Sequence, residues 1–251
     1  MRYLRHLLAA IAVLGITMAT TDDGRADSST TKVPDRSAIE KIVREYLITN
    51  PEVIEEAIRA LQTKRETEEK NRAQAALSAQ GDALRRHPMT PVSGNAKGDV
   101  TVVEFFDYQC GYCKRSLGSM VNLLSSDKNV RVVWKELPIL GPASRFAARA
   151  AMASKRQDKY FDFHVGVMSS QGRLSESKVM SIAADVGLNV DRLREDMKDP
   201  KIEAYLDETL QLANSLGIRG TPAFVIGDTL VPGAVDESRL KRLIAETRAG
   251  G

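Results

Sequence analysis

Cys110 and Cys113 are the only two cysteines of the chain, and only Gly111 and Tyr112 separate them. A disulfide between them would close a very short loop. Because the stabilisation from a disulfide grows with the length of the loop it closes, this bond would add little to the stability of a 251-residue chain. A bond of that kind is better suited to opening and closing. The pair therefore predicts a redox-active dithiol.

Other uses of the two thiols are less consistent with the rest of the sequence. A structural zinc ion usually needs four ligands, and beyond residue 26 the chain adds only His87 and His164, in unrelated segments. Copper(I) binding by the dithiol is chemically allowed, since thiolates are soft ligands. An inert structural disulfide is disfavoured by the short loop. We therefore expect thiol exchange, with no metal and no cofactor.

The cysteines follow an apolar run, Val100–Phe106, that predicts a buried strand, and a helix is predicted from the cysteines to about Leu124. A cysteine in the first turn of a helix lies near free backbone amides and the positive end of the helix dipole, which favour the thiolate. In this geometry Cys110 is expected to be the exposed nucleophile. Cys113, one turn deeper, is expected to attack a mixed disulfide and resolve it.

The remainder of the second half predicts a mixed α/β domain. Residues 130–137 form a second predicted strand, parallel to the first because a helix separates the two. The pattern is helical from Ala143 to Leu216, with breaks near 157, 171–172, 187–189 and 199–200. Residues 223–226 and 229–231 predict a hairpin, and residues 236–248 predict a closing helix.

The start of the chain follows the secretory pattern. Two arginines precede an uncharged, largely apolar stretch of twelve residues, 7–18. That stretch is too short to span a bilayer, which needs about 20 residues, so residues 1–26 are predicted as a signal peptide cleaved after Ala19 or Ala26. An uncleaved anchor is the alternative. Export would bring the dithiol into an oxidising compartment, where disulfides form and rearrange.

Residues 27–80 are predicted to form a helical arm. Apolar residues recur at helical intervals over 39–47 and again over 53–61, and Ser37 and Glu40 have the spacing of a capping box. The following segment, 62–74, is charged and has no apolar face to bury.

The apolar face of residues 35–61 needs a partner, because a short amphipathic helix gains most of its stability from burial. Packing against the chain's own second domain and self-association are both compatible with the pattern. Residues 81–98 carry Gly, Pro, Ser and Asn and are predicted as a linker with a short extended piece.

The overall charge is close to balanced. The formal net charge is +3, and removal of residues 1–26, which hold three arginines and two aspartates, leaves +2. Proteins that bind nucleic acids usually carry a strong basic excess, so no nucleic-acid partner is expected.

Two motifs resemble a known family. The run 103–113, Val-Glu-Phe-Phe-Asp-Tyr-Gln-Cys-Gly-Tyr-Cys, resembles the active-site strand and helix of DsbA-like proteins, which are secreted members of the thioredoxin superfamily. Residues 220–224, Gly-Thr-Pro-Ala-Phe, resemble the cis-proline loop of that superfamily. The resemblance covers 99–248. It implies an α/β fold, in which a thioredoxin domain at 99–251 carries a helical insertion at about 142–216 behind the N-terminal helical arm.

The resemblance also implies roles for individual residues. Pro222 would be cis and lie beside the dithiol, and the backbone of Thr221 would pair with an extended substrate peptide. Glu104 matches the family's buried acid, which relays a proton for Cys113. A salt-bridged glutamate, or one exposed at a sheet edge, is the alternative for this position, because an unpaired buried acid is costly. His164 is expected to be a packed or surface histidine.

The resemblance implies a periplasmic thiol-disulfide oxidoreductase. Gly111, Tyr112 and Thr221 resemble periplasmic isomerases more than the strongest oxidases, and the arm resembles the ScsC-type layout. Such isomerases are oligomers, so we predict an isomerase that forms a homo-oligomer, a trimer, through residues 35–61. Its expected partners are cysteine-containing secreted client proteins and a membrane redox partner protein. A disulfide-donating oxidase and a non-catalytic chaperone or copper-binding dithiol module remain the alternatives.

Overall fold

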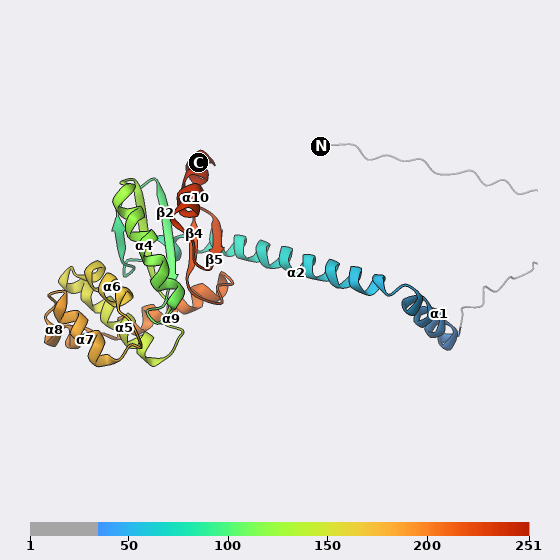
Figure 1. Ribbon diagram of the computed structural model, residues 1–251, viewed down its shortest axis with the longest axis horizontal. Helices are drawn as coiled ribbons and strands as arrows, with labels where there is room; N and C mark the ends of the chain where they lie inside the picture. The colour runs from blue at the N-terminus through green and yellow to red at the C-terminus, as the bar shows by residue number, and fades with distance from the viewer. Residues whose placement is uncertain (1–34, 251) are drawn as a thin grey trace, which may run out of the picture. The chain divides into compact units, whose positions relative to one another are not determined.

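The computed structural model describes residues 35–250 (Figure 1). The predicted signal peptide, 1–26, lies outside the described residues. The chain divides between Ala57 and Ile58 into two units, of which the second contains the dithiol.

A five-stranded mixed sheet, in the order β1-β3-β2-β4-β5, forms the centre of the second unit. Its strands are β1 (Val92–Gly94), β2 (Val100–Phe106), β3 (Val130–Glu136), β4 (Ala223–Ile226) and β5 (Thr229–Pro232). β2 and β3 are parallel, as predicted, because α4 carries the chain between them, whereas β4 runs antiparallel to β2. The predicted hairpin is confirmed as β4 and β5. Gly227 makes its turn with a φ of 56°, a conformation that favours glycine.

Helices cover both faces of the sheet (Figure 1). One face carries α4 (Gly111–Ser126) and α10 (Glu237–Gly250), and the other carries α3 (Gly81–Arg85) and part of α9 (Pro200–Ser215). Between β3 and α9 lie α5 (Pro142–Ser154), η1 (Lys155–Gln157), α6 (Tyr160–Ser169), α7 (Glu176–Asp185) and α8 (Val190–Asp196). This helical insertion and its breaks agree with the prediction.

β2 is buried on both sides, which explains its almost continuous apolar sequence. Because successive side chains of a strand point to opposite faces, Val102 and Phe106 join the core beneath α4. Val103 and Phe105 join the core on the other face. The strand that carries Glu104 is thus held rigidly between two cores.

The segment predicted as a linker, 81–98, is part of the folded domain. It forms α3 and the edge strand β1, which is the predicted extended piece. Leu84 is fully buried, and the Lys135 ammonium donates hydrogen bonds to the Ala83 carbonyl (2.7 Å) and the Thr90 hydroxyl (2.8 Å). One leucine and one buried lysine thus anchor a segment whose composition is typical of loops.

The predicted helical arm contains two helices, α1 (Arg36–Thr49) and α2 (Glu52–Ala79). The predicted capping box is wrong, because α1 begins one residue before Ser37 and Asp35 stands at its N-cap. The Ser37 hydroxyl donates instead to the Asp35 carboxylate at 2.8 Å. The last turns of α2 enter the core of the second unit, where Leu77 is buried.

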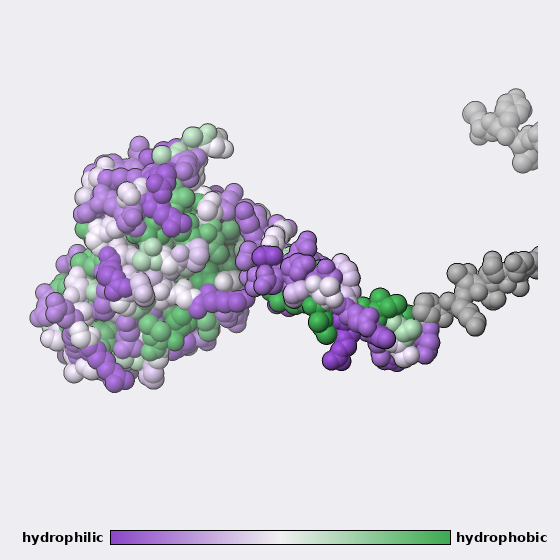
Figure 2. Space-filling view, turned by 45° about the vertical axis from the view of Figure 1, so that its right-hand side comes forward, coloured by the Kyte–Doolittle hydropathy of each residue, from purple (hydrophilic) through white to green (hydrophobic). Residues whose placement is uncertain are grey.

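Most of the large apolar side chains of residues 35–61 are exposed (Figure 2). Ile42 is 62% exposed and Ile48 is 69% exposed in α1. The other exposed large apolar residues of residues 35–61 are Ile39, Val43, Tyr46, Ile54, Ile58 and Leu61. The arm therefore presents hydrophobic surface of the kind that marks interaction sites in soluble proteins.

Candidate active site

Cys110 stands at the N-cap of α4, directly after the turn that follows β2. Its backbone is extended, with φ −72° and ψ 114°, and its sulfur accepts the backbone N–H of Cys113 at 3.4 Å. The sulfur thus occupies the place where a capping oxygen usually stands, at the positive end of the helix dipole. This position agrees with the predicted strand-to-helix geometry, and both cysteines are free thiols in the structure.

Cys110 is less exposed than predicted, with only 7% of its surface accessible. The reason is the loop before β4, because the Cys110 thiol donates to the Thr221 carbonyl at 3.1 Å. Cys113 is buried more deeply, as expected. Burial raises the pKa of the Cys113 thiol well above its usual range, and the charges of Glu104 and Cys110 raise it further.

The Thr221–Pro222 peptide bond is cis, which confirms the prediction from the resemblance. The loop is held from behind, because the backbone N–H of Gly233, after β5, donates to the Pro222 carbonyl at 2.9 Å. The fold therefore brings two motifs about 110 residues apart in the chain into contact through Cys110 and Thr221.

Glu104 lies in the middle of the central strand, opposite Trp134 of β3 and Phe224 of β4. It is buried, so the alternative of a glutamate exposed at an edge is wrong. Burial raises the pKa of its carboxyl to about 8, and the charge of Cys110 contributes to this rise. A carboxyl of this kind holds its proton at neutral pH and is suited to proton transfer near the dithiol.

Gly111 and Tyr112 lie at the surface, at the start of α4. Tyr112 is 61% exposed, and the Arg115 guanidinium stacks 4.2 Å from the centre of its ring. This pair forms an amphipathic surface next to the sulfur of Cys110, with a cation held over an aromatic face.

Asp107, which sequence reasoning missed, fixes the turn before the dithiol. Its carboxylate accepts the N–H of Gln109 (2.7 Å), the N–H of Leu140 (2.9 Å) and the hydroxyl of Ser144 (2.6 Å). An aspartate whose carboxylate accepts the backbone N–H of the residue two positions later forms an Asx turn. The position of Asp107 directly after a predicted strand was therefore a signal for such a turn. Its partners from the start of the helical insertion could not be read from the sequence.

Comparison with known proteins identifies the family. Residues 101–245 match the DSBA-like thioredoxin domain, which is more than half of the chain. The chain belongs to the DSBA-like thioredoxin domain family. Residues 35–68 match a second family, the copper resistance protein ScsC N-terminal domain. The predicted layout, an ScsC-type arm before a DsbA-like domain, is thereby confirmed.

Several solved structures are similar to the chain. A thioredoxin-like oxidoreductase from Silicibacter pomeroyi DSS-3 is 46% identical, with a TM-score of 0.66 over 68% of this chain and 98% of that one. The thiol-disulfide exchange protein alpha-DsbA2 from Wolbachia pipientis is 33% identical, with a TM-score of 0.67 over 70% and 96%. Proteus mirabilis ScsC, in a transitional conformation, is 32% identical, with a TM-score of 0.66 over 86% and 97%.

Several curated relatives that match this chain are much longer proteins. The first of them are Na(+)/H(+) antiporters named NhaA, and the chain spans about a quarter of their length. DsbA-like proteins are thiol-disulfide oxidoreductases, and this chain is a member of that family.

Within residues 35–250, no three His, Cys, Asp or Glu side chains gather in a way that could hold a metal ion.

A buried polar cluster surrounds Glu136 of this DsbA-like domain. The hydroxyls of Tyr108 (3.0 Å) and Tyr160 (2.9 Å) both donate to one oxygen of Glu136. Burial raises the pKa of Glu136 well above its usual range. His164 packs against Trp134, with ring centres 4.5 Å apart, and burial lowers its pKa to about 3, so the ring is neutral. His164 is thus a packed histidine, as expected.

Removing one donor of this cluster is expected to lower stability. In Tyr160→Phe the Glu136 carboxyl loses one of its two tyrosine partners while remaining buried, so we expect a loss of about 1–2 kcal/mol in the free energy of unfolding. Urea unfolding measures the change. Tyr112→Phe, which removes the hydroxyl of an exposed tyrosine outside the arm, is the matched control and should leave the free energy of unfolding unchanged. Equal stability of the two variants would show that the cluster does not stabilise the domain.

Proposed function

We propose that this protein is a periplasmic thiol-disulfide oxidoreductase that rearranges the disulfides of secreted proteins, acting as a disulfide isomerase. The observation that carries the proposal is the position of Cys110, at the amino end of α4 with its sulfur 3.1 Å from the Thr221 carbonyl. Helix amides support its thiolate, and the backbone of the cis-proline loop lies next to it for a client to pair with.

The exchange reaction balances with the two thiols alone. The Cys110 thiolate attacks one sulfur of a client disulfide, so the client S–S bond breaks, a mixed disulfide forms and a client thiolate leaves. In isomerisation another client thiolate then attacks the mixed disulfide, which restores the Cys110 thiolate with no net oxidation. If Cys113 attacks the mixed disulfide first, the client leaves with both of its cysteines reduced. Cys110 and Cys113 are then joined by a disulfide, so the protein has lost the two electrons that the client gained.

Glu104 is proposed to move the proton of Cys113. Part of the rise in the pKa of Glu104 comes from the charge of Cys110. Once the Cys110 sulfur is in a mixed disulfide it carries no charge, so this contribution disappears. Glu104 then becomes the stronger acid and ionises more readily, and its carboxylate can accept the Cys113 proton at the step that needs it.

The client is proposed to bind across the cis-proline loop and the start of α4. Thr221 offers its backbone to an extended client strand, beside the cis-Pro222 ring, and Gly111 and Tyr112 border the reacting sulfur. The exposed ring of Tyr112, with the Arg115 guanidinium stacked on it, supports contact with apolar and acidic client groups.

The arm supports isomerase over oxidase. Residues 35–61 expose a row of large apolar side chains, and the match to the ScsC N-terminal domain covers the same segment. We propose that these residues join copies of the chain into a homotrimer, so that several dithiols face one client. An oxidase, which needs only one dithiol per client, would not need this arrangement.

The proposed place of action is the periplasm, reached by a cleaved signal peptide. The chemistry of the exchange implies cysteine-containing secreted clients and a membrane redox partner that sets the oxidation state of the dithiol. Within residues 35–250, none of the helices combines the length and hydrophobicity that crossing a bilayer requires.

A single charged side chain in the apolar face of α1 tests the proposed assembly through residues 35–61. Ile42→Asp places a carboxylate on the exposed apolar face of α1, and we expect it to convert a trimer into monomers in light scattering. Reactivation of a protein with scrambled disulfides should fall about tenfold or more, while oxidation of a reduced peptide should persist. Ser37→Asp, which adds the same charge at an exposed position of α1, is the control and should leave both properties unchanged.

Two results would favour the oxidase instead. One is a chain that is monomeric at all concentrations, and the other is an Ile42→Asp variant that reactivates the scrambled protein as well as the unmodified chain does. In either case the arm is not the organiser of the dithiols.

A further inference from the structure

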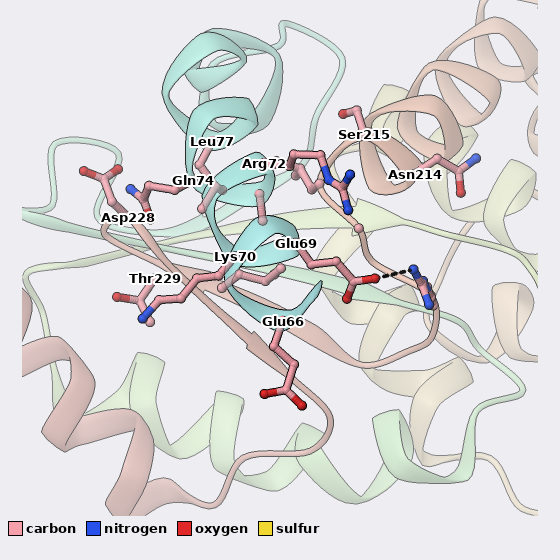
Figure 3. A pocket seen from close by; sticks show the side chains of 15 residues that line it. Glu66, Glu69, Lys70, Arg72, Gln74, Leu77, Asn214, Ser215, Asp228 and Thr229 are labelled. Atoms are coloured by element: carbon pink, nitrogen blue, oxygen red, sulfur yellow. Dashed lines mark hydrogen bonds and ion pairs between the residues drawn. The ribbon is translucent and has the colours of Figure 1, made fainter. Parts of the chain in front are cut away.

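A groove of about 690 Å³ lies between α2, the loop after α9 and the edge strand β5, all within the second unit (Figure 3). Charged side chains of both signs surround it, and Leu77 and Leu230 form part of its apolar lining. The side chains that line it from α2 are Glu66, Glu69, Lys70, Arg72, Ala73, Gln74 and Leu77. The groove therefore offers both polar and apolar contacts along one face of this helix.

The groove continues toward the dithiol. A second hollow, of about 350 Å³, is lined by Thr221 and Pro222 of the cis-proline loop. The two hollows share Glu69, Gly217, Arg219 and Leu230 in their walls. A path along the protein surface thus runs from the backbone next to Cys110 to the charged face of α2.

An ion pair lies across this path. The Arg219 guanidinium lies 3.3 Å from the Glu69 carboxylate and joins the loop before the cis-proline to α2. The dashed line at Glu69 in Figure 3 marks this interaction. Both side chains are largely exposed, 83% for Arg219 and 56% for Glu69. An exposed pair of this kind contributes about 0–1 kcal/mol, so a ligand that offers its own charges can separate the two side chains at little cost.

The chemistry of the groove suits an extended polypeptide. β5 is the last strand of the sheet within residues 35–250, and Thr229 and Leu230 of this strand line the groove. A sheet edge can accept a further strand through backbone hydrogen bonds, while pockets beside it contact alternate side chains. The path begins at the loop where a client cysteine must lie to reach Cys110.

We propose that this groove binds the segment of the client polypeptide that flanks its reacting cysteine, and that α2 is therefore part of the client-binding site. The proposal rests on the proposed disulfide exchange with polypeptide clients. It gives the last turns of the arm helix a direct role in selecting clients, separate from any role of residues 35–61 in assembly.

The test compares two alanines of the same helix. Ala73 lines the groove and is half-buried, whereas Ala75 is exposed and lies on the opposite face of α2, because two residues turn a helix by about 200°. The substrates are mixed disulfides of glutathione with a short cysteine peptide and with the same peptide extended on either its amino or its carboxyl side. Oxidised glutathione, which cannot reach the groove, reports on the dithiol alone.

The unmodified full chain is expected to reduce one of the two extended peptides faster than the short peptide. The rate constant for reduction of its mixed disulfide should be about tenfold higher. Ala73→Trp should lose this gain and Ala75→Trp should keep it, with all three proteins equal toward oxidised glutathione. The proposal is overturned if neither extension raises the rate, or if the gain survives in Ala73→Trp. A chain that reduces neither oxidised glutathione nor the short peptide would instead contradict the proposed function.

A second variant does not depend on filling the groove. Glu69→Lys reverses the charge opposite Arg219 and keeps the size of the side chain similar. We expect it to shift the preference of the protein several-fold toward peptides whose extension is acidic. An unchanged preference between acidic and basic extensions would contradict a binding role for this part of α2.

Discussion

Replacing Cys110 by alanine is expected to lower disulfide exchange on the order of a thousandfold or more, to the background rate. Cys110 alone combines the N-cap position of α4 with access to the cis-proline loop. The sulfur of Cys113 is buried, and burial raises the pKa of its thiol, so it cannot replace Cys110 as the attacking group. The rate of reduction of a peptide mixed disulfide measures the loss.

The matched control for this variant is Cys113→Ala. It removes the resolving thiol but leaves the first attack intact, so a mixed disulfide between Cys110 and the client should accumulate. Non-reducing electrophoresis after acid quenching would detect it. Full activity of Cys110→Ala in cells would contradict the exchange mechanism and favour the chaperone.

Glu104→Gln is expected to change both the pH dependence of stability and the rate of resolution. The pKa of Glu104 is about 8 in the folded protein, against an ordinary value of 4.5. Between these two pH values the folded state keeps a proton that the unfolded state has lost. The free energy of unfolding of the unmodified protein therefore falls as pH rises through this window, by at most about 5 kcal/mol.

In Glu104→Gln this loss is absent. The difference in stability between variant and unmodified protein should therefore grow in favour of the variant from about pH 5 to about pH 8. Other buried groups, such as Glu136, are present in both proteins. Their contributions to the free energy of unfolding therefore cancel in the difference. Urea unfolding across this pH range provides the measurement, and Glu56→Gln, the same change at an exposed position of α2, is the matched control. A difference that does not vary with pH would show that Glu104 is ionised in the folded state.

The same variant tests the proposed proton transfer. A glutamine cannot accept the Cys113 proton, so release of a client from its mixed disulfide with Cys110 should slow about a hundredfold at neutral pH. The first attack by Cys110 should change much less. Rapid acid quenching separates the two steps, and equal slowing of both would point to a structural effect of the substitution.

Local patterns of the sequence predicted most of the architecture. The run Val100–Phe106, the helix after the cysteines and the hairpin around Gly227 all have signals that lie within a few residues of each other. The cis-proline and the buried position of Glu104 were predicted only because their surroundings resemble those of a known family. A single glutamate in an apolar strand does not by itself distinguish a buried acid from an exposed one.

Features that depend on distant partners could not be predicted. Leu84 is one apolar residue in a segment rich in glycine and proline, and only the packed structure shows that it belongs to the core. The low exposure of Cys110 comes from a loop more than one hundred residues later in the chain. Glu69 and Arg219 form an ion pair in the wall of the groove. In the sequence, both look like ordinary charged residues of the surface.

Trp134 is the only tryptophan of the chain, and it is fully buried in register with Glu104. Its indole lies against His164, and it belongs to the same hydrophobic core as Cys110 and Cys113. All tryptophan fluorescence of the protein therefore originates at a single position beside the proposed proton carrier. Intrinsic emission can follow unfolding and changes at the reacting thiols without a label, so the wild-type chain carries its own optical reporter.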